Sequence, residues 1–158
     1  MKKLMVLVVA MTIIAMAGVA MAASQTNTLT VNATVSGSCK FNSNTSTLAF
    51  GVIDPTSASD AIVSIPITYR CTNGTAGTGI DIGNGQYGGT NGVPNYMSDG
   101  TNSLKYTLAI TGDTATGTGF GAGQDKTATV TGTVAVTDFQ NAVASSGYAD
   151  SVILAINP

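Results

Sequence analysis

The sequence predicts an all-β protein, a β-sandwich of short strands that follows an N-terminal leader. Apolar residues alternate with polar ones at a period of two along most of the chain, whereas the 3.6-residue helical period is nearly absent. Glycine occurs 19 times, and clusters of Gly, Pro and Asn separate the alternating runs. The chain has 158 residues, of which only 9% are charged and none is Glu, so long salt-bridged helices are disfavoured. This length suggests one domain, with or without a leader.

The composition also limits the possible functions. Because the chain has no His, it has neither a histidine general base nor a histidine-ligated metal. The net charge of -2, with only six Lys and Arg, lacks the basic character of a nucleic-acid-binding protein. We therefore expect a protein that is not an enzyme, with no cofactor, no metal and no nucleic-acid partner.

The first 22 residues have the layout of a secretory signal peptide. A basic start at residues 1–3 precedes an apolar run at residues 4–17 and an A-x-A cleavage pattern at residues 20–22. The apolar run is shorter than the ~20 residues that a membrane-spanning helix needs. We expect cleavage after residue 22, which leaves an exported chain without a membrane span.

Cys39 and Cys71 are the two cysteines, and both lie in the exported part of the chain. An oxidising compartment favours a disulfide between them. The alternatives are two separate buried thiols, or a metal site that would lack further soft ligands.

Two alternating runs come early in the exported chain. The first covers residues 28–35, and its apolar face consists of Leu29, Val31, Ala33 and Val35. Cys39 keeps the parity of that face. The second covers residues 47–53, with Leu48, Phe50 and Val52 on one face, and ends at the turn signal Asp54-Pro55.

The remaining runs extend to the end of the sequence. Residues 62–71 alternate, but Pro66 within them cannot donate a hydrogen bond to a ladder, so we expect a sheet edge or a bulge there. Three further strands are expected at residues 80–82, 104–111 and 128–136. Glycine-rich loops are expected at residues 83–100 and 117–123, and a single helical turn fits residues 139–146. The final run, residues 148–156, places Val152, Leu154 and Ile156 on one face.

The two ends of the exported chain would be complementary in an assembly. We expect the final strand to lack a successor that pairs with it, and the first alternating run to lack an upstream anchor. An exposed apolar strand together with an unfilled sheet edge favours aggregation, unless the strand of one subunit fills the edge of the next. Such head-to-tail contacts do not close, and so they produce filaments. From the pattern alone, residues 28–35 could equally be a first strand paired within its own domain.

Several short motifs, taken in order, resemble those of a known family. Leu48-Ala49-Phe50-Gly51 is similar to an L-x-F-G stretch after the first cysteine, and Tyr69-Arg70-Cys71 is similar to the segment around the second. Met97 followed by Leu104-Lys105-Tyr106, and then residues 147–152 (GYADSV), continue the series. The family is the spore coat protein U domain, which includes major subunits of archaic chaperone–usher pili. Two departures affect the late loops: Phe120-Gly121 stands where Trp-Gly is expected, and a glycine near Val136 is missing.

This resemblance implies an incomplete immunoglobulin-like β-sandwich of about six strands plus an N-terminal donor strand, with one disulfide. The implied segments are a signal peptide at 1–22, a donor segment at 23–36 and a pilin domain at 37–158. The implied donor residues are Leu29, Val31, Ala33 and Val35, and the implied acceptor groove includes Val152, Leu154 and Ile156. The implied partners are other pilus subunits, a periplasmic chaperone and an outer-membrane usher, and the implied location is a pilus at the cell surface, where it would support adhesion or biofilm formation.

The sequence is also compatible with two other functions. A self-contained coat or matrix protein would have its first strand paired in cis. A secreted carbohydrate-binding module would use Tyr87 and Tyr96 in the glycine-rich region. The G-x-G-x-x-G match at residues 83–88 lacks the following helix that a dinucleotide site needs. Residues 121–125 resemble a calcium-binding repeat, but such sites need tandem copies.

Overall fold

Within the residues that the structure describes, seven antiparallel strands form two sheets. The computed structural model describes residues 24–88 and 94–158, so the signal peptide predicted at residues 1–22 lies outside the described residues. The chain divides into two units, residues 1–34 and 35–158, and the strands that the structure describes all belong to the second. The elements in chain order are β1 (Cys39–Phe41), β2 (Ala61–Cys71), β3 (Ile80–Gly85), β4 (Asn95–Ser98), β5 (Ser103–Thr111), β6 (Lys126–Val134), α2 (Val136–Phe139) and β7 (Val152–Ile156).

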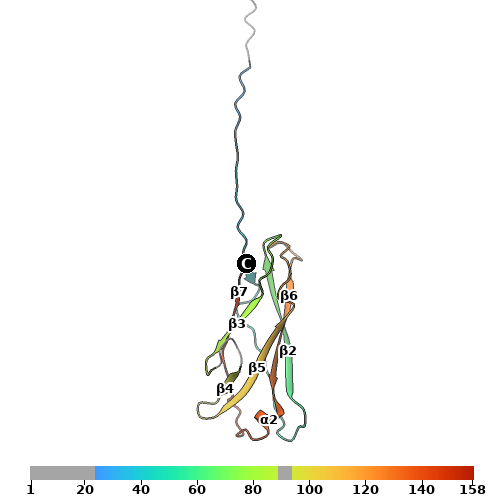
Figure 1. Ribbon diagram of the computed structural model, residues 1–158, viewed down its shortest axis with the longest axis vertical. Helices are drawn as coiled ribbons and strands as arrows, with labels where there is room; N and C mark the ends of the chain where they lie inside the picture. The colour runs from blue at the N-terminus through green and yellow to red at the C-terminus, as the bar shows by residue number, and fades with distance from the viewer. Residues whose placement is uncertain (1–23, 89–93) are drawn as a thin grey trace, which may run out of the picture. The chain divides into compact units, whose positions relative to one another are not determined.

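The larger sheet has five strands in the order β1-β2-β6-β5-β4, and the smaller sheet pairs β3 with β7 (Figure 1). This arrangement confirms the prediction of an all-β, sandwich-like fold. β1 pairs only with Tyr69–Cys71, so the β1 side of β2 has no strand partner at Pro66, which fits the expected edge position. The helical turn expected at residues 139–146 is wrong except at its first residue, because the four-residue helix α2 covers Val136–Phe139 and ends there.

Two buried clusters between the sheets form the core. The first lies at the end of the domain that carries the disulfide, which we call the disulfide end. Its buried members are Tyr69, Cys71, Ile80 and Ala128. The second lies at the opposite end, beside α2, which we call the α2 end. Its buried members are Leu104, Tyr106, Val134 and Phe139. Because both clusters draw on alternate residues of the strands, the period-two pattern identified the core faces.

The polar region expected to be a loop at residues 83–100 contains strand residues at both ends. β3 continues to Gly85, and β4 occupies Asn95–Ser98. Gly83 and Gly85 lack side chains at positions where a Cβ would lie 2.9 Å from the carbonyl oxygen of Ile153 and 2.1 Å from Asp150 Oδ2. These glycines therefore allow close packing inside a strand pair. The sequence pattern alone does not distinguish glycines of this kind from those of a loop.

The strand expected at residues 47–53 is absent, and the prediction of which of its side chains face the core is partly wrong. Gly51 has φ = 68°, a left-handed conformation that changes the alternation of the side chains. As a result Val52 is fully exposed, whereas Phe50 and Ile53 pack against the second cluster. The alternation identified Phe50 correctly but missed the change of side after Gly51.

Candidate functional site

The strand β7 has one paired edge and one open edge. Its ladder with β3 joins Ile156 to Ile80 and Leu154 to Ile82. Within residues 24–88 and 94–158, no ladder uses the other edge of β7. The backbone groups along that edge are therefore available to a further strand.

The inward face of β7 is incompletely covered. Val152, Leu154 and Ile156, the three residues expected to line an acceptor groove, are half-buried and pack against the two core clusters. Ile153, on the opposite face, is 76% exposed. The sequence thus predicted correctly which face of this strand meets the core, while the role of these residues in accepting a strand stays a prediction.

A segment without strands contacts the same part of the core. Residues 42–60 contain no strand, yet Phe50 packs against the α2-end cluster, as does Val152 of β7. The ring of Phe50 meets that of Tyr106 edge-on, with centroids 6.5 Å apart and an interplanar angle of 67°. Gly132 of β6 makes room for this segment, since a Cβ there would lie 2.8 Å from Leu48 Cδ2 and 2.9 Å from Phe50 Cζ.

The expected donor residues lie in a segment with an irregular backbone. Residues 24–38 form neither helix nor strand. Leu29, Val31 and Val35 are 83%, 81% and 82% exposed, and Ala33 is exposed as well. Three large aliphatic side chains at alternate positions are thus in solvent, which is an unfavourable state for apolar surface.

The backbone between this segment and β1 is held by residue 72 and the disulfide. Cys39 and Cys71 form the predicted disulfide and face each other in the β1–β2 ladder. One residue further out, the N–H of Thr72 donates to the carbonyl oxygen of Ser38 at 2.9 Å, and the N–H of Ser38 donates to Thr72 Oγ1 at 3.1 Å. The pairing therefore continues past the end of β1.

A polar network, which the sequence analysis did not predict, fixes the start of β7. Asp150 accepts hydrogen bonds from Tyr106 Oη at 2.6 Å, from the N–H of Gln86 at 2.7 Å and from the N–H of Ser151 at 2.8 Å. Beside it, the fully buried Asn95 accepts a hydrogen bond from the N–H of Gly85. The available signal was the presence of Tyr106 and Asp150 in two of the family-like motifs, which this network joins.

Replacing Tyr106 with phenylalanine should make the stability of the domain less sensitive to alkaline pH. Burial and the hydrogen bond to Asp150 raise the pKa of Tyr106 above its ordinary value of 10.0. A raised pKa contributes stability that is fully present below the unfolded-state pKa and is lost as the pH rises through the folded-state pKa. The variant should lose about 1.5–3 kcal/mol near pH 7, and this deficit should shrink above pH 10. Urea denaturation at pH 7 and pH 11 measures both values, and an equal deficit at the two pH values would contradict the assignment.

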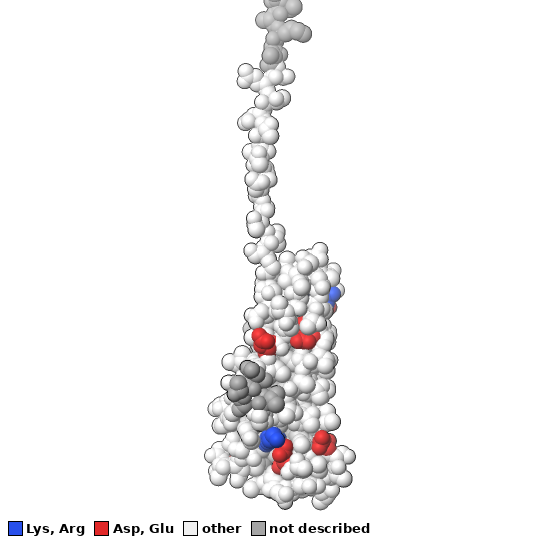
Figure 2. Space-filling view, viewed as in Figure 1, with Lys and Arg blue, Asp and Glu red and all other residues white. Residues whose placement is uncertain are grey.

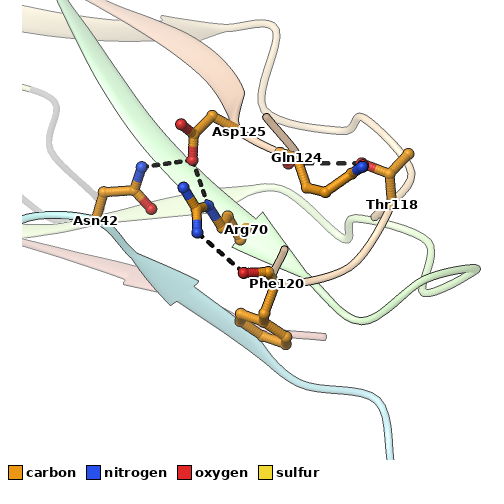
Figure 3. A network of polar contacts seen from close by, with 6 residues as sticks. All are labelled: Asn42, Arg70, Thr118, Phe120, Gln124 and Asp125. Atoms are coloured by element: carbon orange, nitrogen blue, oxygen red, sulfur yellow. Dashed lines mark hydrogen bonds and ion pairs between the residues drawn. The ribbon is translucent and has the colours of Figure 1, made fainter. Parts of the chain in front are cut away.

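A second polar network ties the late loop to the disulfide end (Figure 3). The Arg70 guanidinium donates to Asp125 and, at 3.0 Å, to the carbonyl oxygen of Phe120. Asn42 Nδ2 donates to the same Asp125 oxygen at 2.7 Å. The hydrogen bond from Arg70 and then that from Asn42 lower the pKa of Asp125 below its ordinary value. An open groove of about 470 Å³ lies beside this network and is lined by Lys40, Phe41, Asn42, Arg70 and Phe120.

The other motifs do not assemble into a site. Residues 83–85 of the G-x-G-x-x-G match belong to β3, and residues 86–87 form a turn rather than the start of a helix. Among the described residues, no three His, Cys, Asp or Glu side chains are placed to hold a metal ion. Tyr87 is 44% exposed, and Tyr96 is half-buried on β4. No helix within the described residues has the length and apolarity to cross a membrane.

Comparison with known families agrees with this architecture. The family model of the Spore Coat Protein U domain matches residues 25–155. The chain belongs to the Spore Coat Protein U domain family. Proteins of this family are exported surface or coat proteins, structural and non-enzymatic, and the domain is associated with pilus and coat proteins of the chaperone–usher type. The match includes the exposed segment that carries Leu29 and Val35. No curated protein matches the chain.

Proposed function

We propose that this Spore Coat Protein U domain protein is a pilus shaft subunit that polymerises by donor-strand exchange. The observation that carries the proposal is the open edge of β7, above a half-covered core face. The strand-free segment at residues 42–60 supports it, because Phe50 contacts the same cluster as Val152 without belonging to a sheet. A strand from another copy, placed along β7, would cover the core there and use the free backbone groups.

The N-terminal segment has the composition that such a donor needs. Leu29, Val31 and Val35 are more than 80% exposed, and burying each would contribute roughly 1.5–3 kcal/mol. Each new backbone hydrogen bond would add about 0.5–1.5 kcal/mol. Because the donor and the acceptor belong to different copies, the assembly does not close and grows as a filament.

This proposal includes the route to the cell surface. The signal peptide at residues 1–22 directs export, and a periplasmic chaperone protects the open edge of β7. At an outer-membrane usher, the donor strand of the next subunit replaces the chaperone at this edge. An unprotected edge of this kind would pair non-specifically, which is the physical reason for a chaperone. The resulting filament serves surface adhesion or biofilm formation.

Deleting residues 24–35 should abolish polymerisation and preserve chaperone binding, because the deletion removes the donor and leaves the β7 edge intact. Val31→Asp should have the same effect, since it would place a carboxylate in an apolar groove. Thr30→Asp is the matched control, because Thr30 lies on the opposite face of the segment and the variant should polymerise normally. Electron microscopy and unheated gel electrophoresis of surface fractions measure filaments, and copurification measures chaperone binding.

Two results would overturn the proposal. One is a filament that survives the deletion. The other is a monomer that stays folded without any chaperone and has residues 28–35 protected from hydrogen exchange in cis, which would favour the self-contained coat protein.

A further inference from the structure

The charged side chains of residues 35–158 are unevenly distributed between the two ends of the domain. At the α2 end, Asp60 accepts a hydrogen bond from the N–H of Val136, and Asp138 belongs to α2 itself. The charged residues of this end are Asp54, Asp60, Asp99, Asp138, Asp150 and Lys105, which give a net charge of about -4 at neutral pH. Figure 2 shows carboxylates beside cationic atoms at this end, and further carboxylates nearer the disulfide end.

The outer face of the large sheet at the disulfide end has the opposite sign. Lys40 and Arg70 are directly opposite each other in the β1–β2 ladder, and like charges in this position repel. Asp125 forms an ion pair with Arg70, whereas Lys40 has no ion-pair partner among the residues that the structure describes. An unneutralised lysine therefore belongs to the lining of the groove, as does Phe120, which is 46% exposed.

Chain connectivity decides which ends meet in the proposed filament. β7 runs from the α2 end to the disulfide end, and three residues separate the donor segment from β1, which begins at the disulfide end. If the donor pairs antiparallel to β7, the disulfide end of the donor copy comes to lie beside the α2 end of the acceptor copy. If it pairs parallel to β7, two disulfide ends meet, with their cationic faces close together. Charge complementarity favours the antiparallel arrangement.

We propose that successive copies in the filament make an ionic contact, in which the groove beside Lys40 receives the acidic turns at the α2 end of the next copy. This inference rests on the proposed function and adds the surface through which neighbouring copies touch. Exposed ion pairs contribute little affinity, about 0–1 kcal/mol each. The contact therefore sets the polarity and spacing of the copies, while the donor strand holds them together.

Zero-length carbodiimide cross-linking of assembled filaments tests this contact. The reagent joins a lysine amine to a carboxylate only where the two touch, and mass spectrometry identifies the linked peptides. We expect links from Lys40 to one or more of Asp54, Asp60, Asp99 and Asp138. These links can only join different copies, because the 11 residues of β2 separate the two ends of one domain by about 35 Å. Lys105 and Asp138, whose Nζ and Oδ2 atoms are 3.9 Å apart in one copy, provide an internal positive control.

Salt and one variant sharpen the test. The yield of the Lys40 links should fall several-fold between 0.01 M and 1 M salt, as the screening length shortens from about 30 Å to about 3 Å. Lys40→Gln should remove the links and leave filaments present. Filaments that show the Lys105 link but no Lys40 link to an α2-end carboxylate would overturn the contact alone. The absence of any filament would overturn the proposed function and, with it, this contact.

Discussion

Replacing Cys39 and Cys71 together with alanine should lower the free energy of unfolding by roughly 3–4 kcal/mol. The disulfide closes a loop whose ends are 32 positions apart in the sequence, and loop-closure entropy predicts a loss of this size. Domains of this size are stable by only about 5–15 kcal/mol. The melting temperature should therefore fall by roughly 10–20 °C.

The position of the disulfide adds to its effect. Cys71 is fully buried in the disulfide-end cluster, and Cys39 anchors the three-residue β1. Without the bond, β1 would depend on three cross-strand pairs, and the N-terminal segment would be attached to a loosened strand. Urea denaturation of the variant, with and without reductant, measures the loss. Reductant should lower the wild-type midpoint to that of the variant and leave the variant unchanged, and a variant within 1 kcal/mol of wild type would contradict the prediction.

The sequence predicted best those strands that bury one face. β2, β5 and β6 coincide closely with the alternating runs. In these strands every second side chain faces the core and is apolar, so the sequence shows a period of two. β4 was missed because its buried Asn95 is polar, and its carboxamide oxygen is satisfied by the N–H of Gly85. Such a residue interrupts the hydrophobic pattern without exposing the strand.

The segment at residues 47–53 failed for a different reason. Alternation predicts which side chains face the core, and Phe50 does so, but a strand also needs a backbone partner. No such partner exists for this segment in the described chain, and the left-handed conformation of Gly51 changes the side to which the following side chains point. The polar network of Asp150 was likewise out of reach, because it joins Tyr106, Gln86 and Ser151 through contacts that no local pattern encodes.

Gly117→Ala should destabilise the domain by about 2–4 kcal/mol, although it adds only one methyl group. Gly117 is buried against the end of β2, and a Cβ there would lie 2.4 Å from the carbonyl oxygen of Thr72 and 2.6 Å from that of Cys71. Both obstacles are backbone atoms, so they cannot rotate away as a flexible side chain would. The backbone must shift, which strains the hydrogen bonds from Gly117 N to Thr75 O at 2.8 Å and from Gly119 N to Cys71 O at 2.9 Å.

Gly121→Ala is the matched control in the same loop. A Cβ at residue 121 would have its nearest neighbour, Gln124 Cγ, at 3.8 Å, and no positive φ restricts this residue. This substitution should therefore leave the free energy of unfolding unchanged or raise it by about 0.4–1 kcal/mol, because alanine reduces the entropy of the unfolded chain. Urea denaturation compares the two variants, and equal stabilities would contradict the tight packing at Gly117. The displaced loop contacts the backbone of the buried Cys71. Gly117→Ala should therefore also let reductant cleave the disulfide faster than in Gly121→Ala, which links local packing to the bond that anchors β1.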